Sequence, residues 1–167
     1  MASLYDTSIP PFIRGLTNLK GLLEKGRAYA AEQGWEESEL TQARLVEDMQ
    51  PLTYQVQRVS DTAKGLAVRV GQAENEAFPD EEVTLDDLVA RIDRTIAFLQ
   101  NVPAAGFDGR DDAEVVLKTP NREITFTGTS YVLGFAVPNF YFHITAAYAI
   151  LRMKGVPVGK MDYLGAQ

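Results

Sequence analysis

Four long segments of the chain place apolar residues at alternating intervals of three and four positions. This spacing puts the apolar side chains on one face of an α-helix, so each segment predicts an amphipathic helix. The predicted helices span residues 8–33, 50–70, 85–101 and 138–154. Four helices with one apolar face each can bury those faces in one shared core. The sequence therefore predicts an all-α fold, a four-helix bundle, in a single domain over residues 1–167.

The apolar face of each predicted helix can be read directly from the sequence. In the first three helices it consists of Ile9, Phe12, Leu16, Leu19 and Leu23; of Leu52, Val56, Val59, Ala63, Leu66 and Val70; and of Leu85, Leu88, Ile92, Ile96 and Leu99. In the last helix the predicted face contains Phe135, Asn139, Phe142, Ala146, Ile150 and Met153.

The connections carry turn and strand signals. Residues 35–48 predict a short connector helix, and the acidic, proline-containing segment 72–83 predicts a loop. The runs VVL and ITF flank a Pro-Asn turn, which predicts a small β-hairpin before the last helix. Pro138 should kink the last segment or break it into a short piece and a main helix, because proline removes one helical hydrogen bond. We expect the tail after residue 155 to be irregular.

Charge and composition exclude several classes of function. The chain has 16 basic and 23 acidic residues, a formal charge of −7, which opposes binding to nucleic acid or to anionic membranes. It has no cysteine, so disulfides, thiolate metal sites and cysteine nucleophiles are excluded. We find neither a signal peptide nor an apolar run long enough to span a membrane, and we therefore expect a cytoplasmic protein.

The stretch NFYFHITAAYAILR contains His143, the only histidine of the chain. It could be a metal ligand, an acid–base group, or a core residue with a hydrogen bond. A helical HxxxH metal motif would need a second histidine at position 147, where the chain has Ala147. We predict that His143 is largely buried, hydrogen-bonded and not bound to a metal ion.

A polar strip on the predicted helix 50–70 offers possible partners for His143. Gln57, Asp61 and Lys64 are spaced by four and three positions, so they share one side of that helix. They could form a solvated edge, or Gln57 and Asp61 could face His143 across the bundle interior. With Asn139 and Tyr148 of the last helix, these residues are the candidates for a polar pocket.

Three consecutive aromatic residues, Phe140, Tyr141 and Phe142, point about 100° apart on a helix and cannot all face one core. At least one of them must contact a second surface, such as the hairpin, the N-terminal segment or another subunit. Symmetric pairing of such a helix is the commonest way to cover it, so we predict a homodimer.

Three segments, MASLYDTSIPPFIRGL, PLTYQVQRVSDTAKG and PNFYFHITAAYAILRMKGVPVGKMDYLG, resemble a bacterial and fungal family of unknown function. That family is grouped with the DinB/YfiT-like metalloenzymes. The resemblance implies a four-helix bundle with a long crossover connection, commonly a dimer. It also implies a divalent metal on three histidines, one from the second long helix and an HxxxH pair from the last, and relatives that include thiol-dependent transferases.

Here only His143 matches that triad: Ala147 replaces the second histidine of the pair, and Gln57 or Asp61 stands where the third would be. Our first hypothesis is therefore a protein without a cofactor that binds a small molecule or a partner in the polar pocket between helices 50–70 and 138–154. The alternative is a divergent metal-dependent hydrolase or thiol transferase that uses His143 with Asp61 and Gln57.

Overall fold

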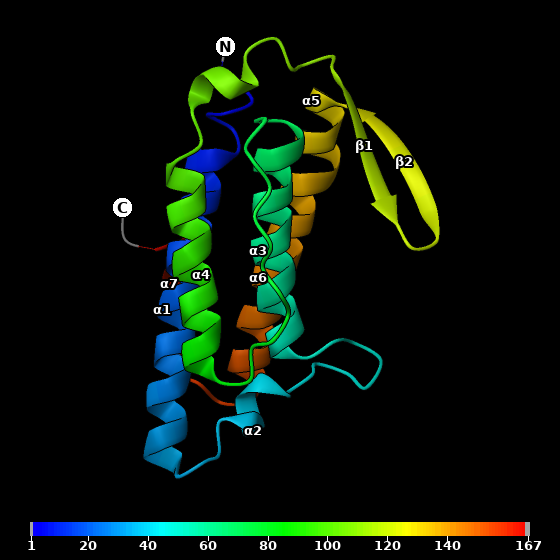
Figure 1. Ribbon diagram of the computed structural model, residues 1–167. Coiled ribbons are helices and arrows are strands. Elements are labelled where there is room, and N and C mark those ends of the chain that lie inside the picture. The colour runs from blue at the N-terminus through cyan, green and yellow to red at the C-terminus, as the bar shows by residue number, and fades with distance from the viewer. Residues whose placement is uncertain (1, 166–167) are drawn as a thin grey trace.

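The computed structural model describes residues 2–165. Its four long helices are α1 (Ile9–Gln33), α3 (Leu52–Arg69), α4 (Leu85–Gln100) and α6 (Val137–Met153) (Figure 1). Shorter elements are α2 (Ser38–Thr41), α5 (Gly128–Tyr131), α7 (Lys160–Leu164) and a hairpin of β1 (Glu114–Thr119) and β2 (Arg122–Thr127). The predicted all-α fold, with a connector helix and a small hairpin before the last long helix, is confirmed.

The long helices form a bundle in which α3 and α4 run in the same direction, opposite to α1 and α6 (Figure 1). Two neighbouring parallel helices need a connection that returns along the whole bundle. The segment 71–84 is that crossover. Its direction is fixed by its contacts with α3, because Glu76 lies at Lys64 while Glu82 lies at Gln57, further back along the helix. The long crossover that the resemblance implied is thus present.

The start of α4 follows from local sequence. The Thr84 hydroxyl accepts a hydrogen bond from the Asp87 backbone N–H (3.1 Å), and the Asp87 carboxylate accepts one from the Thr84 N–H (2.8 Å). This reciprocal capping box satisfies two N–H groups that the helix itself leaves unpaired. The capping box places the end of the crossover at Thr84, and so it sets the residue at which α4 begins.

Helix α3 is buried on more than one face. Its predicted apolar stripe lies in the core, and polar residues on other sides, including Gln55, Gln57, Ser60 and Thr62, are buried too. The reason is that α3 contacts α6, α4, α1 and the crossover at once. More of the surface of α3 is therefore buried than its single apolar stripe predicts.

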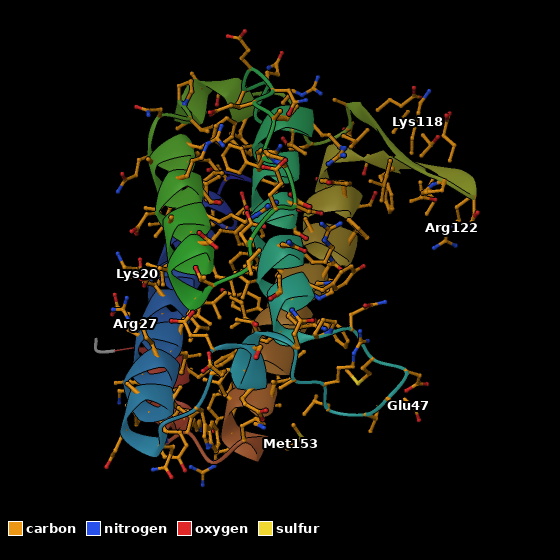
Figure 2. All side chains as sticks on the ribbon, turned by 60° about the horizontal axis from the view of Figure 1, so that its bottom comes forward. Lys20, Arg27, Glu47, Lys118, Arg122 and Met153 are labelled. Atoms are coloured by element: carbon orange, nitrogen blue, oxygen red, sulfur yellow. The ribbon has the colours of Figure 1, made fainter. Side chains whose placement is uncertain are left out.

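The predicted core face of α6 is wrong, because the helix is rotated about its axis relative to the prediction. The residues that enter the core are Phe140, Ile144, Ala147 and Leu151, together with Ala146 and Ile150, whereas Phe142 is 57% exposed and Met153 is 50% exposed. Figure 2 shows Met153 at the surface near the end of α6. The helix is apolar on nearly every side, so its spacing fits more than one face. Packing makes the choice, because the ring of Phe140 stacks on that of Phe12 at 4.0 Å between centroids.

The predicted interruption before Pro138 takes the form of a π-helical turn and not of a break. Residues Val132–Ala136 form this turn, and the backbone stays helical from α5 through it into α6. The expectation of an irregular tail is corrected, because residues Lys160–Leu164 form α7 against α1. The Gly159 N–H donates to the Asp162 carboxylate (2.8 Å), which starts this helix.

Candidate functional site

His143 and Gln55 pair across the contact between α6 and α3. The imidazole Nδ1 lies 2.8 Å from the side-chain oxygen Oε1 of Gln55. The amide nitrogen of Gln55 donates to the backbone carbonyl of Gln50 at 2.9 Å, so its oxygen must be the atom that faces the ring. Nδ1 therefore carries the proton and donates to Gln55, which leaves Nε2 as the atom with a lone pair.

The Nε2 atom of His143 is available to a ligand. It has no hydrogen-bond partner among residues 2–165, and it is not among the buried polar atoms that lack one. His143 is half-buried, so the prediction of a largely buried side chain is only partly met. A hydrogen-bonded ring with an accessible acceptor atom can bind a donor group or accept a proton.

The electrostatic environment keeps His143 neutral. Burial and, as a smaller cause, the positive charge of Arg58 together lower the pKa of His143 to about 4. The guanidinium of Arg58 lies over the ring of Tyr54, at 5.0 Å from the centroid, and that ring packs edge-on to His143 at 6.2 Å. At neutral pH the imidazole is uncharged and only a weak base.

Asn139 lies one helical turn before His143 and binds the same neighbouring helix. Its amide nitrogen donates to the Thr62 hydroxyl at 2.8 Å, and that hydroxyl donates to the Arg58 carbonyl at 2.6 Å. Gln55 and Thr62 are seven positions apart and so share a face of α3. We call Gln55, Thr62, Asn139 and His143 the α3–α6 polar seam.

The structure does not bring Asp61 and Gln57 to His143. Asp61 pairs with Arg91 of α4 and with Arg58, each at 2.8 Å, and the Gln57 amide donates to Glu82 of the crossover at 2.8 Å. The reason is helical geometry: Gln57 is two positions from Gln55 and therefore points about 200° away. The expectation that both residues face His143 is corrected.

Tyr148, the remaining candidate, also lies away from the α3–α6 polar seam. Its ring packs edge-on to that of Tyr163 in α7, at 5.9 Å between centroids. The residue that the sequence reasoning missed is Gln55. Gln55 and Thr62 are polar positions at a seven-residue spacing on α3, but this spacing alone does not indicate that their side of the helix meets α6.

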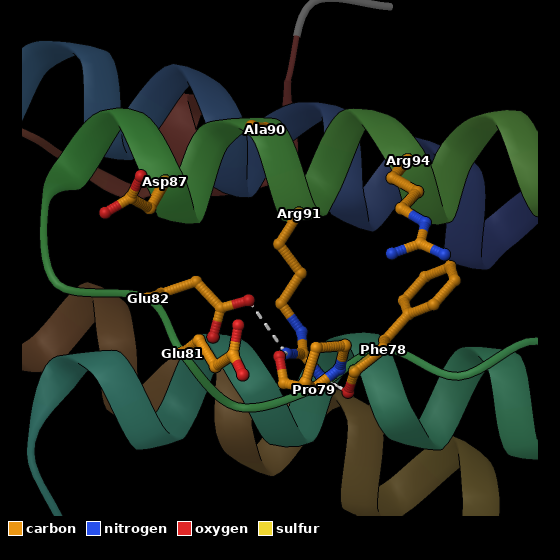
Figure 3. A pocket seen from close by; sticks show the side chains of 8 residues that line it. All are labelled: Phe78, Pro79, Glu81, Glu82, Asp87, Ala90, Arg91 and Arg94. Atoms are coloured by element: carbon orange, nitrogen blue, oxygen red, sulfur yellow. Dashed lines mark hydrogen bonds and ion pairs between the residues drawn. The ribbon is translucent and has the colours of Figure 1, made fainter.

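Asp61 and Gln57 belong to a second polar cluster, which is centred on Arg91. Arg91 lines the groove between α4 and the crossover (Figure 3). The Arg91 side chain is only 2% exposed and lies within 3.0 Å of carboxylate oxygens of Asp61, Asp80 and Glu82. It also donates to the Pro79 carbonyl at 3.0 Å. Burial alone would lower the pKa of Arg91, but the three carboxylates outweigh it and the pKa is raised.

This cluster holds the crossover against the bundle. Figure 3 shows Arg91 reaching from α4 to the crossover at Pro79, and Arg94 beside the ring of Phe78. Arg94 and Lys64 lie over that ring from α4 and α3, at 4.0 and 4.8 Å from its centroid. Through its carboxylate partners Arg91 links α4 to Asp61 of α3 and to Asp80 and Glu82 of the crossover.

The donor set around His143 does not suit the divalent metal that the resemblance implied. The position on α3 that faces His143 is Gln55, its amide oxygen is already bonded to Nδ1, and the nearest charge is the cation Arg58. Within residues 2–165 no three histidine, cysteine or acidic side chains come together as a metal site would require.

Two comparisons place the chain in a family. The model of the family described as a domain of unknown function (DUF1993) matches residues 4–164. The chain belongs to this family. It is also similar to the crystal structure of a DinB family member protein from Shewanella denitrificans, at 36% sequence identity and a TM-score of 0.89, over 98% of this chain and 93% of that one.

The DUF1993 family therefore has a DinB-like fold, as the resemblance implied. No curated protein matches the chain. Among the described residues no helix is both long and apolar enough to cross a membrane.

Proposed function

We propose that this DUF1993 protein is a binding protein that holds a small molecule or a partner group at the α3–α6 polar seam, without a histidine-triad metal. The observation that carries the proposal is the pairing of His143 with Gln55, which fixes the ring and leaves Nε2 as a free acceptor. A site built to accept one hydrogen bond discriminates strongly against ligands that lack the donor.

The chemistry of the seam indicates which ligands it would hold. A neutral Nε2 accepts from an O–H or N–H group, and the nearby Arg58 disfavours a cation. The half-buried ring of Tyr54 lies next to His143, at 6.2 Å between ring centroids, and offers an apolar contact. We therefore expect an uncharged or anionic ligand that combines a donor group with an apolar part.

A matched pair of probes tests this proposal. Phenol and anisole have similar rings, but only phenol can donate to Nε2. We expect phenol to shift the ¹⁵Nε2 resonance of His143 in a saturable way, at millimolar concentration, and anisole to bind at least about tenfold more weakly. Equal shifts with both probes, or none at Nε2 with either, would contradict the proposal. Tyr148→Phe, on α6 but packed on Tyr163 of α7 away from the seam, is the control variant and should respond to phenol like the parent chain.

The alternative expected from the sequence, a divergent metal-dependent hydrolase or thiol transferase that uses His143 with Asp61 and Gln57, is not proposed, because Asp61 pairs with Arg91 and Gln57 with Glu82. A metal-dependent activity would have to use His143 without these two residues. The hydrogen bond that orients the His143 ring, as in many metal-binding histidines, makes that version worth testing. Calorimetric titration with Zn²⁺, Ni²⁺ and Fe²⁺ separates the two functions. Stoichiometric binding that is lost in His143→Ala would favour the alternative.

We also propose that the protein is a cytoplasmic homodimer that pairs through the outer face of α6. Support comes from the exposed side chains of Phe142 and Met153, and from an apolar groove of about 410 Å³ that Phe142 shares with Leu45 and Met49 of the α2–α3 loop. Light scattering should give twice the 18.4 kDa chain mass. The variant Phe142→Ser should be a monomer, and cell fractionation tests the location.

A further inference from the structure

A second cavity lies on the other side of α6, between α1, α6 and α7. Its volume is about 560 Å³, within the range of small-molecule sites. Its wall on α6 includes Tyr141, which is two positions from His143 and therefore points about 200° away from it. This cavity is independent of the α3–α6 polar seam, so its function does not rest on the one proposed above.

The walls of this cavity combine an apolar body with a few polar groups. Pro10, Pro11 and Ile144 provide apolar surface, and α7 closes one side with Tyr163 and Leu164. Polar contacts hold α7 in place: Asn18 donates to the Tyr163 carbonyl (3.0 Å), and the Tyr163 hydroxyl lies 3.0 Å from that of Thr145. An apolar pocket with a small number of fixed polar groups is the usual form of a ligand site.

Arg14 supplies a positive charge to the cavity, and no carboxylate among residues 2–165 forms an ion pair with it. One of its terminal nitrogens donates to the Leu164 carbonyl at 2.9 Å. A guanidinium has five N–H donors, so Arg14 retains donors for a ligand.

Tyr141 supplies a second free donor. Its hydroxyl has no hydrogen-bond partner among the described residues, although the side chain is half-buried. Burial raises the pKa of Tyr141, and the neighbouring Tyr163 adds to this rise, while Arg14 opposes it. The hydroxyl therefore stays protonated at neutral pH and can donate to an oxygen that Arg14 also binds.

Asp6 limits the charge of the ligand. It lines the same cavity, but its Oδ2 accepts from the N–H and the hydroxyl of Ser3, at 3.0 and 2.8 Å. These bonds lower the pKa of Asp6, so it is ionised at neutral pH. Its charge is exposed to water and therefore screened, yet it still favours a single negative charge over the two of a phosphate ester.

We infer that the α1–α6–α7 cavity binds a small organic carboxylate with an apolar body, whose carboxylate is held by Arg14 and Tyr141. A planar carboxylate matches the guanidinium geometry and can accept from both groups. The apolar body lies against Pro10, Pro11 and Ile144.

The test follows the amide and side-chain NMR signals of Tyr141, Ile144 and Tyr163 during titration of the full chain with benzoate, hexanoate, benzamide and inorganic phosphate. We expect saturable shifts with at least one of the two carboxylates. Benzamide, which has the ring of benzoate without its charge, and phosphate should each bind at least about tenfold more weakly. Absence of shifts with both carboxylates, or equal binding of benzamide or phosphate, overturns the inference.

Variants locate the binding. Arg14→Gln should weaken carboxylate binding roughly ten- to a hundredfold, since it removes a charged hydrogen bond. Tyr141→Phe keeps the ring and the fold and should weaken binding about threefold or more. Arg27→Gln, on the same helix but paired with Asp86 outside the cavity, is the control and should bind like the parent chain. If Arg14→Gln and Tyr141→Phe both bind like this control, the inference is wrong.

Discussion

The side chain of Gln55 fixes that of His143: its oxygen accepts from Nδ1 at 2.8 Å while its nitrogen donates to the Gln50 carbonyl at 2.9 Å. Both ends of the amide are therefore satisfied, and neither can rotate without losing a bond. The relationship turns the only histidine of the chain into a neutral acceptor with one defined orientation, and it can be tested by pH and by mutation.

His143 should titrate far below an ordinary histidine. Because its pKa is lowered to about 4 in the folded chain, the unfolded chain binds a proton first as pH falls below about 6.5. Its contribution to stability is thus present above pH 6.5 and is lost progressively down to pH 4. The size should be about 1–2 kcal/mol, allowing for partial exposure of the ring.

The measurement is NMR titration of the imidazole, which no other histidine overlaps. Urea unfolding at pH 7 and pH 4.5 gives the change in the free energy of unfolding with pH. In His143→Gln this change should be smaller by the part that His143 contributes. A midpoint near 6.5 would mean that the ring is solvated and that Gln55 does not hold it.

Gln55→Leu should destabilise the protein by about 1–3 kcal/mol, because it leaves the His143 N–H and the Gln50 carbonyl without their partner. A double-mutant cycle with His143→Phe isolates the pair. We expect a coupling energy between about 0.5 and 3 kcal/mol. Additive effects of the two substitutions would show that the bond contributes nothing to stability.

Arg91→Met should destabilise the protein strongly, by about 3–5 kcal/mol, since it leaves three carboxylates without their buried cation. The matched control is Arg94→Met. Arg94 is one turn along the same helix and pairs with Glu76 of the crossover, but about half of its side chain is exposed, so its loss should cost less than about 1 kcal/mol. Chemical denaturation of both variants gives the comparison. Similar losses would show that burial of Arg91 does not matter.

The sequence predicted where the helices and strands lie along the chain better than it predicted which face of a helix meets the core. The bounds of the long helices, the hairpin around Pro120 and the interruption before Pro138 rest on local rules, and local rules act within a few residues. The core face of α6 depends instead on tertiary packing, because Phe140 and Phe142 are equally apolar and only contact with Phe12 distinguishes them. Gln55 was missed for a similar reason: which side of α3 meets α6 is decided by the whole bundle.

The last prediction concerns two glycines of α1 that the sequence does not distinguish. A Cβ at Gly15 would lie 2.7 Å from Cε1 of Phe140, within the stack of Phe140 on Phe12, whereas a Cβ at Gly21 has no atom within 4 Å. Gly15→Ala should therefore destabilise the protein by about 1–3 kcal/mol through overpacking. Gly21→Ala should stabilise it by about 0.5–1 kcal/mol, because alanine favours the helix interior. Thermal and urea unfolding measure both substitutions. A stabilising Gly15→Ala would mean that α1 and α6 pack less closely at this point than the ring stack indicates.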